Sequence, residues 1–285
     1  MSFIRSGSQL GAVALSDDQL SRIAPSIFAQ ARHDSRSARY SYIPTSEILA
    51  GMRAEGFLPT FAKQGGSRVV GKAAFTKHLI RFRRVDQMAI KPALGALYPE
   101  VVLINSHDGT SAYQVSAGLM RLVCLNGMMV ADKEFASVRV PHKGDVMGQV
   151  IEGSFTVLDE STRALDVAES WAGVTLSHDE SRIMAESARM IRFEDSDGKI
   201  NTPITAAQLL RPRRAEDRGS DLWTINNVLQ ENAIRGGQTA WGRDANGRQR
   251  RVTSREIGAI DKDVKINRAL WHLATEMAKL KGVHA

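Results

Sequence analysis

The hydrophobic residues of this chain change from a strand-like to a helix-like spacing near residue 144, and this change limits the folds that the chain can adopt. Before it, residues 75–84 (FTKHLIRFRR) alternate in the manner of a strand, whose successive side chains point to opposite faces. After it, apolar residues recur every three or four positions, most regularly over residues 266–280 (INRALWHLATEMAKL), as on an amphipathic helix. Strands followed by helices predict an α+β fold rather than a doubly wound sheet.

In outline, the chain is predicted to form an N-terminal helix opening at Pro44, an antiparallel β-meander of three to five strands, a long helix packed on the sheet, and a helical C-terminal part. The strands are expected between residues 75 and 140, and the long helix over residues 144–175. Ser177 and Glu180 form an S-x-x-E capping box, so a further helix should begin there.

Three regions follow from these elements. Residues 1–40 are polar and rich in Ser and Arg, and we interpret them as an arm with a short helix. Residues 41–176 are predicted to form an α+β core, and residues 177–285 a helical region. The helical region contains two basic loops, 211–220 (RPRRAEDRGS) and 236–255 (GGQTAWGRDANGRQRRVTSR).

The chain is basic, and most of its excess charge lies in one place. Among its 285 residues, 38 Lys and Arg outnumber 31 Asp and Glu, which gives a formal charge of +7 and a pI of about 9.7. Residues 211–255 hold ten Arg and five acidic residues, and so carry +5 of that charge. Concentrated positive charge favours a polyanionic partner such as nucleic acid.

Several other classes of protein are disfavoured. The sequence contains no run of 18 apolar residues, so no membrane helix is predicted. The first residues also lack a signal-peptide pattern. Cys124 is the single cysteine and can form neither an intrachain disulfide nor a Cys-rich zinc site, so a reducing cytoplasm is the expected setting. The phosphate loop, the dinucleotide fingerprint and the G-x-S-x-G and H-E-x-x-H motifs are all missing from the sequence. We therefore predict a protein without enzymatic activity, cofactor or metal.

The predicted strand at 75–84 carries cations on both faces. Lys77, Arg81 and Arg83 share one face, and His78 and Arg84 lie on the other. Alternate residues of a strand repeat about every 7 Å, a spacing that suits a phosphate backbone. We predict a nucleic-acid contact here, the alternative being a solvated face of the sheet.

Other polar residues stand out singly. Lys91 follows the basic strand closely, and Arg121 lies within an apolar run, where a cation should be paired or face a ligand. Both are predicted nucleic-acid contacts. Asn227 and Glu231 are four residues apart on one predicted helix; with Asn232 they are candidates to cap a loop or to contact a neighbouring subunit.

The second basic loop combines an aromatic residue with cations. Trp241 lies among Arg235, Arg243, Arg248, Arg250 and Arg251. Single-stranded nucleic acid is commonly bound in this way, with bases stacked on an aromatic ring and the backbone neutralised by cations. The alternative is a surface loop whose Trp packs on the core.

Two His-Asp pairs, at 107–108 and 178–179, raise the possibility of a metal-dependent nuclease. Each pair also has a structural interpretation. Asp108 precedes Gly109 in a predicted turn, and Asp179 falls in the first turn of a capped helix, where an acid is favoured by the helix dipole.

Five segments of the chain resemble the recurring blocks of the domain of unknown function 932 family, which is found in phage-like and plasmid-like proteins. In order, they are residues 41–56, 77–83, 99–110, 118–127 and 222–237. More weakly, the predicted topology is similar to the core of single-strand annealing proteins of the Red-beta, RecT, Erf and Rad types. This second resemblance implies ATP-independent rings or filaments that hold single-stranded DNA in a basic groove, and it assigns no residue.

These observations lead to one expected function and two alternatives. We expect a single-stranded DNA-binding and annealing protein of a phage or plasmid, acting as a cytoplasmic homo-oligomer in homologous recombination, alone or with a partner exonuclease or single-strand binding protein. The first alternative is an anti-defence protein of a mobile element that binds a host protein. The second is a metal-dependent nuclease or nucleotide-processing enzyme that uses His107 and Asp108, with or without His178 and Asp179.

Overall fold

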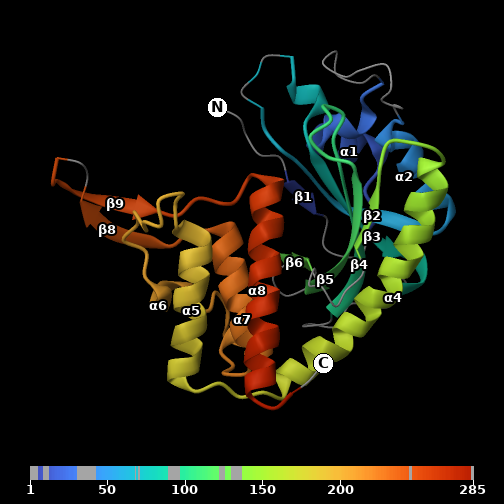
Figure 1. The fold of residues 1–285 in the computed structure, drawn as a ribbon. Helices are drawn as coiled ribbons and strands as arrows, with labels where there is room; N and C mark the ends of the chain where they lie inside the picture. The colour runs from blue at the N-terminus through green and yellow to red at the C-terminus, as the bar shows by residue number, and fades with distance from the viewer. Residues whose placement is uncertain are drawn as a thin grey trace. The chain divides into compact units, whose positions relative to one another are not determined.

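The computed structural model of the chain is shown in Figure 1. It describes residues 6–8, 13–30, 43–67, 69, 71–88, 97–121, 126–129, 137–243 and 246–283. The chain forms two compact units. The first comprises Met1–Leu165 with Gly258–Ile260, and the second Asp166–Ile257 with Asp261–Ala285. The division lies inside a long helix, α4 (Val146–Ala172), ahead of the predicted boundary at residue 176.

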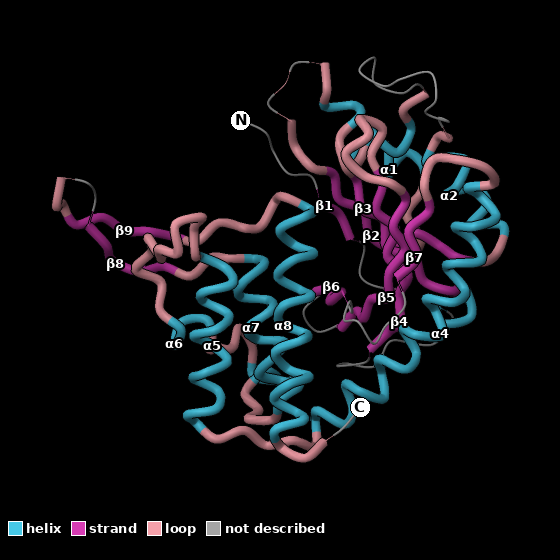
Figure 2. The backbone as a smooth tube through the Cα atoms, viewed as in Figure 1, coloured by secondary structure: helices cyan, strands magenta, loops and turns pink. Residues whose placement is uncertain are grey.

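An antiparallel sheet of seven strands organises the first unit (Figure 2). Its strands are β1 (Ser6–Ser8), β2 (Phe57–Gln64), β3 (His78–Arg84), β4 (Leu97–Asn105), β5 (Tyr113–Arg121), β6 (Asn126–Met129) and β7 (Ser137–Val140). They are arranged in the order β1-β2-β3-β4-β5-β6, and β7 pairs with the other end of β5. The strands predicted between residues 75 and 140 are present as β3 to β7. Strand β2, at residues 57–64, was not predicted and extends the meander.

Helices pack on one face of this sheet. The helices of the first unit are α1 (Asp17–Ile23), α2 (Thr45–Ala54), α3 (Val85–Met88) and the first part of α4. Ser161 of α4 donates a hydrogen bond to the backbone oxygen of Glu100 at 2.9 Å. Gly153 approaches β7 so closely that a Cβ there would lie 2.9 Å from the Val138 side chain. These contacts confirm the prediction of a long helix packed on the sheet.

The two faces of the sheet differ in character. On one face, Ile80 pairs with Leu103 and Phe82 with Val101, and all four side chains are fully buried. The alternate residues of β3 point the other way. That second face carries charged side chains, which are described with the site.

The second unit is mainly helical. It holds α5 (His178–Phe193), α6 (Ala206–Leu209), α7 (Leu222–Arg235) and most of α8 (Ile260–Leu280). Trp171 packs against Trp271 and Trp223, with ring centroids 4.6 and 6.3 Å apart. The capping box predicted at Ser177 and Glu180 is present at the start of α5. The α+β fold class and the helical C-terminal part are thus confirmed.

One element of the second unit was not predicted. Residues 236–255, expected to form a loop, contain a two-stranded antiparallel hairpin of β8 (Thr239–Arg243) and β9 (Gln249–Thr253). It extends away from the helices of its unit (Figure 1). Its Arg- and Gly-rich composition hides the strand pattern, because apolar residues do not alternate along it. No helix among the described residues is long and apolar enough to cross a membrane.

Candidate nucleic-acid interface

The hairpin β8–β9 is attached through one face and exposes the other. Its register pairs Trp241 with Arg251, and such opposed residues point to the same side. Arg243, two residues along β8, shares this side. On the opposite side, Gly242 lies so near Pro203 that a Cβ there would be 3.0 Å from the proline ring. The side with Trp241 therefore faces outward.

This outward face is aromatic and cationic. Trp241 is 69% exposed, and Arg243 and Arg251 on the same side are exposed as well. Arg248 before β9 and Arg250, which pairs with Gly242 and lies on the other side, are also exposed. Trp241 therefore does not pack on a core, which was the alternative interpretation of this residue. We call Trp241, Arg243 and Arg251 the hairpin platform.

Two glycines set the base of the hairpin. Gly236 and Gly237 have φ values of 66° and 87°, a region that side chains rarely adopt. The N–H of Gly237 donates to the oxygen of Ser254, and the N–H of Ser254 donates to the oxygen of Gln238, both at 2.8 Å. A Cβ on Gly236 would lie 2.6 Å from the Ser254 oxygen. The end of α7 thus leads directly into a fixed hairpin.

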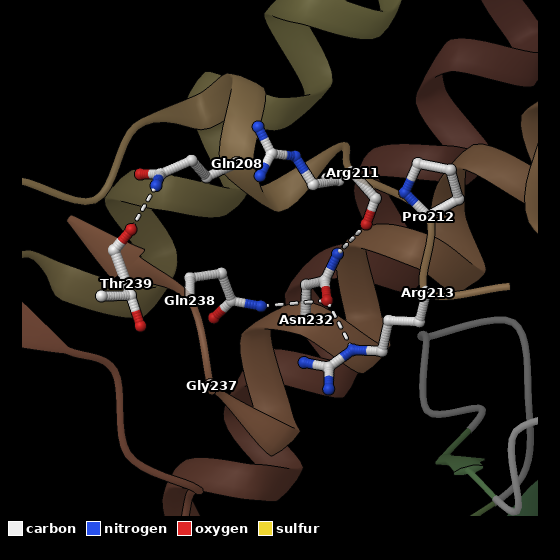
Figure 3. A pocket seen from close by; sticks show the side chains of 8 residues that line it. All are labelled: Gln208, Arg211, Pro212, Arg213, Asn232, Gly237, Gln238 and Thr239. Carbon is white, nitrogen blue, oxygen red and sulfur yellow. Dashed lines mark hydrogen bonds between the residues drawn. The ribbon is translucent and has the colours of Figure 1, made fainter.

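A pocket of about 330 Å³ lies beside the hairpin base (Figure 3). It is lined by Gln208, Arg211, Pro212, Arg213, Asn232, Gly237, Gln238 and Thr239. The Asn232 side chain connects its walls. Its Nδ2 donates to the backbone oxygens of Leu209 and Arg211 at 2.7 and 3.0 Å. Its Oδ1 accepts from Arg213 Nε at 2.7 Å and from Gln238 Nε2 at 2.9 Å. Asn232 therefore caps a loop, one of the two roles predicted for it.

Arg235 belongs to an ion-pair network behind this pocket. Oε1 of the buried Glu231 accepts from Arg235 Nη1 at 3.0 Å and from Arg214 Nη2 at 2.7 Å. Arg214 also pairs with Asp217 at 2.7 Å. Asn227 instead donates to a carbonyl one turn earlier in α7, at 2.7 Å. Part of the Arg235 charge is thus already neutralised, although its side chain stays 40% exposed.

Arg81 and Arg83 share one face of β3, as the alternation predicted, but that face is buried. The two residues are 6% and 1% exposed. Arg83 Nη2 donates to Glu100 Oε1 at 2.8 Å, and Arg81 Nη1 lies 3.4 Å from Glu100 Oε2. The Arg83 guanidinium also lies 4.4 Å from the centre of the Tyr98 ring. A buried carboxylate, rather than phosphate or solvent, faces these cations, so the arrangement of β3 gives no support to their predicted nucleic-acid role.

The remaining predicted contacts are dispersed. His78 is fully buried, 2.9 Å from Ser26 Oγ and 3.0 Å from Thr45 Oγ1, and burial together with the neighbouring His107 lowers its pKa to about 3. A neutral, buried imidazole is not a phosphate contact, which corrects the expectation for His78.

Arg84 is held against aromatic rings. Its guanidinium lies 5.4 Å from the centre of Phe57 and 5.6 Å from that of Phe155, and its Nη1 donates to the Glu55 oxygen at 2.5 Å. Lys77 is half-buried just before β3, and Arg121 is 9% exposed at the end of β5. Lys91 and Cys124 lie outside the described residues.

The two His-Asp pairs lie in different units of the chain, and in the second pair Asp179 contacts Arg182 at 3.5 Å. His107 Nε2 lies 3.1 Å from Thr45 Oγ1, whereas Asp108 accepts from Thr110 at 2.6 Å and pairs with Lys72 at 3.3 Å. Burial raises the pKa of Asp108, but hydrogen bonds from Thr110 and Ser106 and the Lys72 ammonium outweigh it, so its pKa lies below the usual value. Among the described residues, no group of three His, Cys, Asp or Glu side chains could hold a metal ion.

Sequence reasoning located the basic loop 211–220 but assigned no site within it. The structure brings Arg211 and Arg213 of that loop to the same pocket as Gln238 and Thr239 of the hairpin base. The signal was the Arg-Pro-Arg-Arg run at 211–214, but its pairing with the second loop depends on Asn232, which lies between them in the sequence.

Fold and site together define an α+β protein with an aromatic and cationic hairpin on a helical unit. The chain belongs to the family described as Domain of unknown function (DUF932), whose model matches residues 32–271. This confirms the family predicted from the five sequence blocks. The chain is 44% identical to UPF0380 protein YafZ and 43% identical to UPF0380 protein YfjQ, both of Escherichia coli (strain K12). Each match spans 260 residues, 91% of this chain and 90% of the relative. No solved structure matches the chain.

Proposed function

We propose that this protein binds single-stranded DNA on the hairpin platform and promotes its annealing to a complementary strand without ATP. The observation that carries the proposal is the exposure of Trp241 directly opposite Arg251 on an outward-facing strand pair. An exposed indole offers a surface on which a base can stack, and the flanking guanidinium groups neutralise the backbone.

The platform favours single strands over a duplex. Stacking on an indole requires a base whose face is free, which a paired and stacked base does not offer. The platform also contains no set of amide and guanidinium groups converging on one base edge, so recognition by it should not depend on sequence.

Annealing adds a requirement beyond binding, because the bound strand must present its bases to a complement. The support for this part is topological. A meander, β2 to β5, is followed by the long helix α4 packed on it, as in the arrangement expected of single-strand annealing proteins. A ring or filament of subunits would hold a strand extended, so mass measurements with and without a strand belong to the test.

The proposal is tested by fluorescence anisotropy of a labelled single-stranded oligonucleotide, with and without its complement and at several salt concentrations. We expect salt-sensitive binding and faster duplex formation. Trp241→Ala should weaken binding by roughly 5- to 100-fold, in line with about 1–3 kcal/mol per stacked base. Trp241→Phe should retain most of the affinity, since an aromatic face remains.

The contribution of the cations to strand binding is tested through the dependence of the binding constant on salt concentration. Arg251→Gln should reduce the slope of log K against log salt by about 0.7, the value for one phosphate contact on a single strand. The matched control is Arg163→Gln on α4, an exposed arginine that pairs with Glu160. Absence of binding at low salt, or equal effects of both variants, would contradict the proposal.

A further inference from the structure

In the pocket beside the hairpin base, some hydrogen-bonding groups already have partners and others remain available to a ligand. The amide oxygens of Gln208, Asn232 and Gln238 each already accept a hydrogen bond, from Thr205, Arg213 and Ser254 respectively, among others. The lining amides therefore offer little to a base edge or to a metal cation.

The guanidinium groups are different. Arg211 is exposed and makes no side-chain hydrogen bond or ion pair with any described residue. Arg213 is fixed through Nε to Asn232 and through Nη2 to the backbone oxygen of Gly236, which leaves its Nη1 available next to Gly237. Figure 3 shows both side chains on the pocket wall, with the Asn232 and Gln238 side chains between their guanidinium groups. The unused groups are thus donors that carry positive charge.

Charge around the pocket is not balanced. The pocket and the network behind it contain four guanidinium groups, of Arg211, Arg213, Arg214 and Arg235, and two carboxylates, of Asp217 and Glu231. The surplus of two positive charges matches a phosphate monoester, which carries about −1.5 to −2 at neutral pH, better than a phosphodiester. Burial lowers the pKa of Arg213, and the positive charges of Arg235 and Arg214 lower it as well, whereas the carboxylate of Glu231 raises it. A bound anion would reduce the repulsion among these cations.

We propose that this pocket binds a phosphate monoester through Arg211 and Arg213. Its volume of about 330 Å³ lies at the lower end of the range for ligand pockets and accommodates a phosphate with its sugar. If the proposed function holds, the terminal phosphate of the bound strand is the natural source, because Thr239 both lines the pocket and begins the strand that carries Trp241. A free mononucleotide offers the same chemistry.

The test compares oligonucleotides of one sequence with a 5′-phosphate, a 3′-phosphate or hydroxyl ends, alongside a mononucleotide and inorganic phosphate measured by calorimetry. A terminal phosphate should tighten strand binding about tenfold, since the free energy of one hydrogen bond to a charged group corresponds to an affinity change of about that size. Arg211→Gln should abolish this gain while leaving the binding of the hydroxyl-ended strand within about twofold. Arg218→Gln is the matched control, an exposed arginine of the same loop outside the pocket.

The outcomes separate the two proposals. Loss of strand binding in Trp241→Ala with the phosphate effect intact on the mononucleotide supports both. Binding of the mononucleotide or of phosphate that is lost in Arg211→Gln, without any strand binding, sustains the pocket and overturns the proposed function. Equal affinity for phosphorylated and hydroxyl-ended strands, together with no binding of mononucleotide or phosphate, overturns the pocket.

Discussion

Arg83 Nη2 donates a hydrogen bond to Glu100 Oε1 at 2.8 Å, and both side chains are almost fully buried on one face of the sheet. Arg81 completes the cluster, and Thr60 donates a further hydrogen bond to Glu100 Oε1 at 3.2 Å. A buried ion pair is costly to break from one side only, because the remaining charge stays out of water without its partner.

Glu100→Gln should therefore destabilise the protein by about 3–5 kcal/mol, since it removes the charge of a buried carboxylate that pairs with two buried guanidinium groups. Urea unfolding measures the change. Glu160→Gln is the control, because Glu160 pairs with Arg163 at the surface of α4 and should change the free energy of unfolding by less than about 1 kcal/mol. Equal effects of the two variants would show that the cluster around Glu100 contributes nothing particular to stability.

The buried histidines predict loss of stability in acid. Burial, with a contribution from a neighbouring histidine in each case, lowers the pKa of His78 to about 3 and that of His107 to about 4, against 6.5 in the unfolded chain. At pH values between the folded-state pKa of each histidine and 6.5, the unfolded state binds more protons than the folded state. Stabilisation from the neutral imidazoles is therefore complete above about pH 6.5 and is lost as the pH falls from there towards 4, by up to about 1.4 kcal/mol per pH unit for each histidine.

Urea titrations at pH 7, 6 and 5 test this dependence. His78→Gln should flatten the dependence of the unfolding free energy on pH by about one proton, whatever its effect at pH 7. A slope unchanged by His78→Gln would mean that His78 does not titrate differently in the two states.

Asn232 should be important for the order of the pocket. Asn232→Ala removes four hydrogen bonds, of which two tie down the backbone at Leu209 and Arg211. We expect a loss of about 2–4 kcal/mol and faster amide exchange around residue 211, since buried polar partners are left unsatisfied. The exposed Asn201, whose side chain donates to Asp195, provides the comparison, and an equal loss in Asn201→Ala would contradict the role of Asn232.

The tryptophans give a direct check on the hairpin platform. Trp241 is 69% exposed, whereas Trp171 and Trp271 are at most 1% exposed and Trp223 is 8% exposed. Trp241→Phe should remove most of the iodide-quenchable fluorescence and shift the remaining emission to shorter wavelength. Undiminished quenching in this variant would place the accessible indole elsewhere.

Much of the fold was predictable because it depends on local patterns. The capping box at Ser177, the meander after residue 75 and the long helix after residue 144 all follow from the spacing of apolar residues and from helix-start signals. The hairpin at 239–253 was missed because its strands bury little and so carry no apolar alternation. Its conformation instead follows from cross-strand pairing and the glycines at its base.

The α+β class, the family and the two basic segments follow from the amino-acid sequence alone, because composition and periodicity are local properties. Which cations are accessible depends instead on how distant parts of the chain pack. Alternation placed Arg81 and Arg83 on one face of a strand, but whether that face meets water depends on Glu100, which belongs to a different strand. Trp241 and Arg251 are exposed because the other face of their hairpin rests on Pro203, a contact between distant parts of the chain. The positions of the charged residues are known from the sequence, whereas their burial or exposure results from the packing of residues that are far apart along the chain.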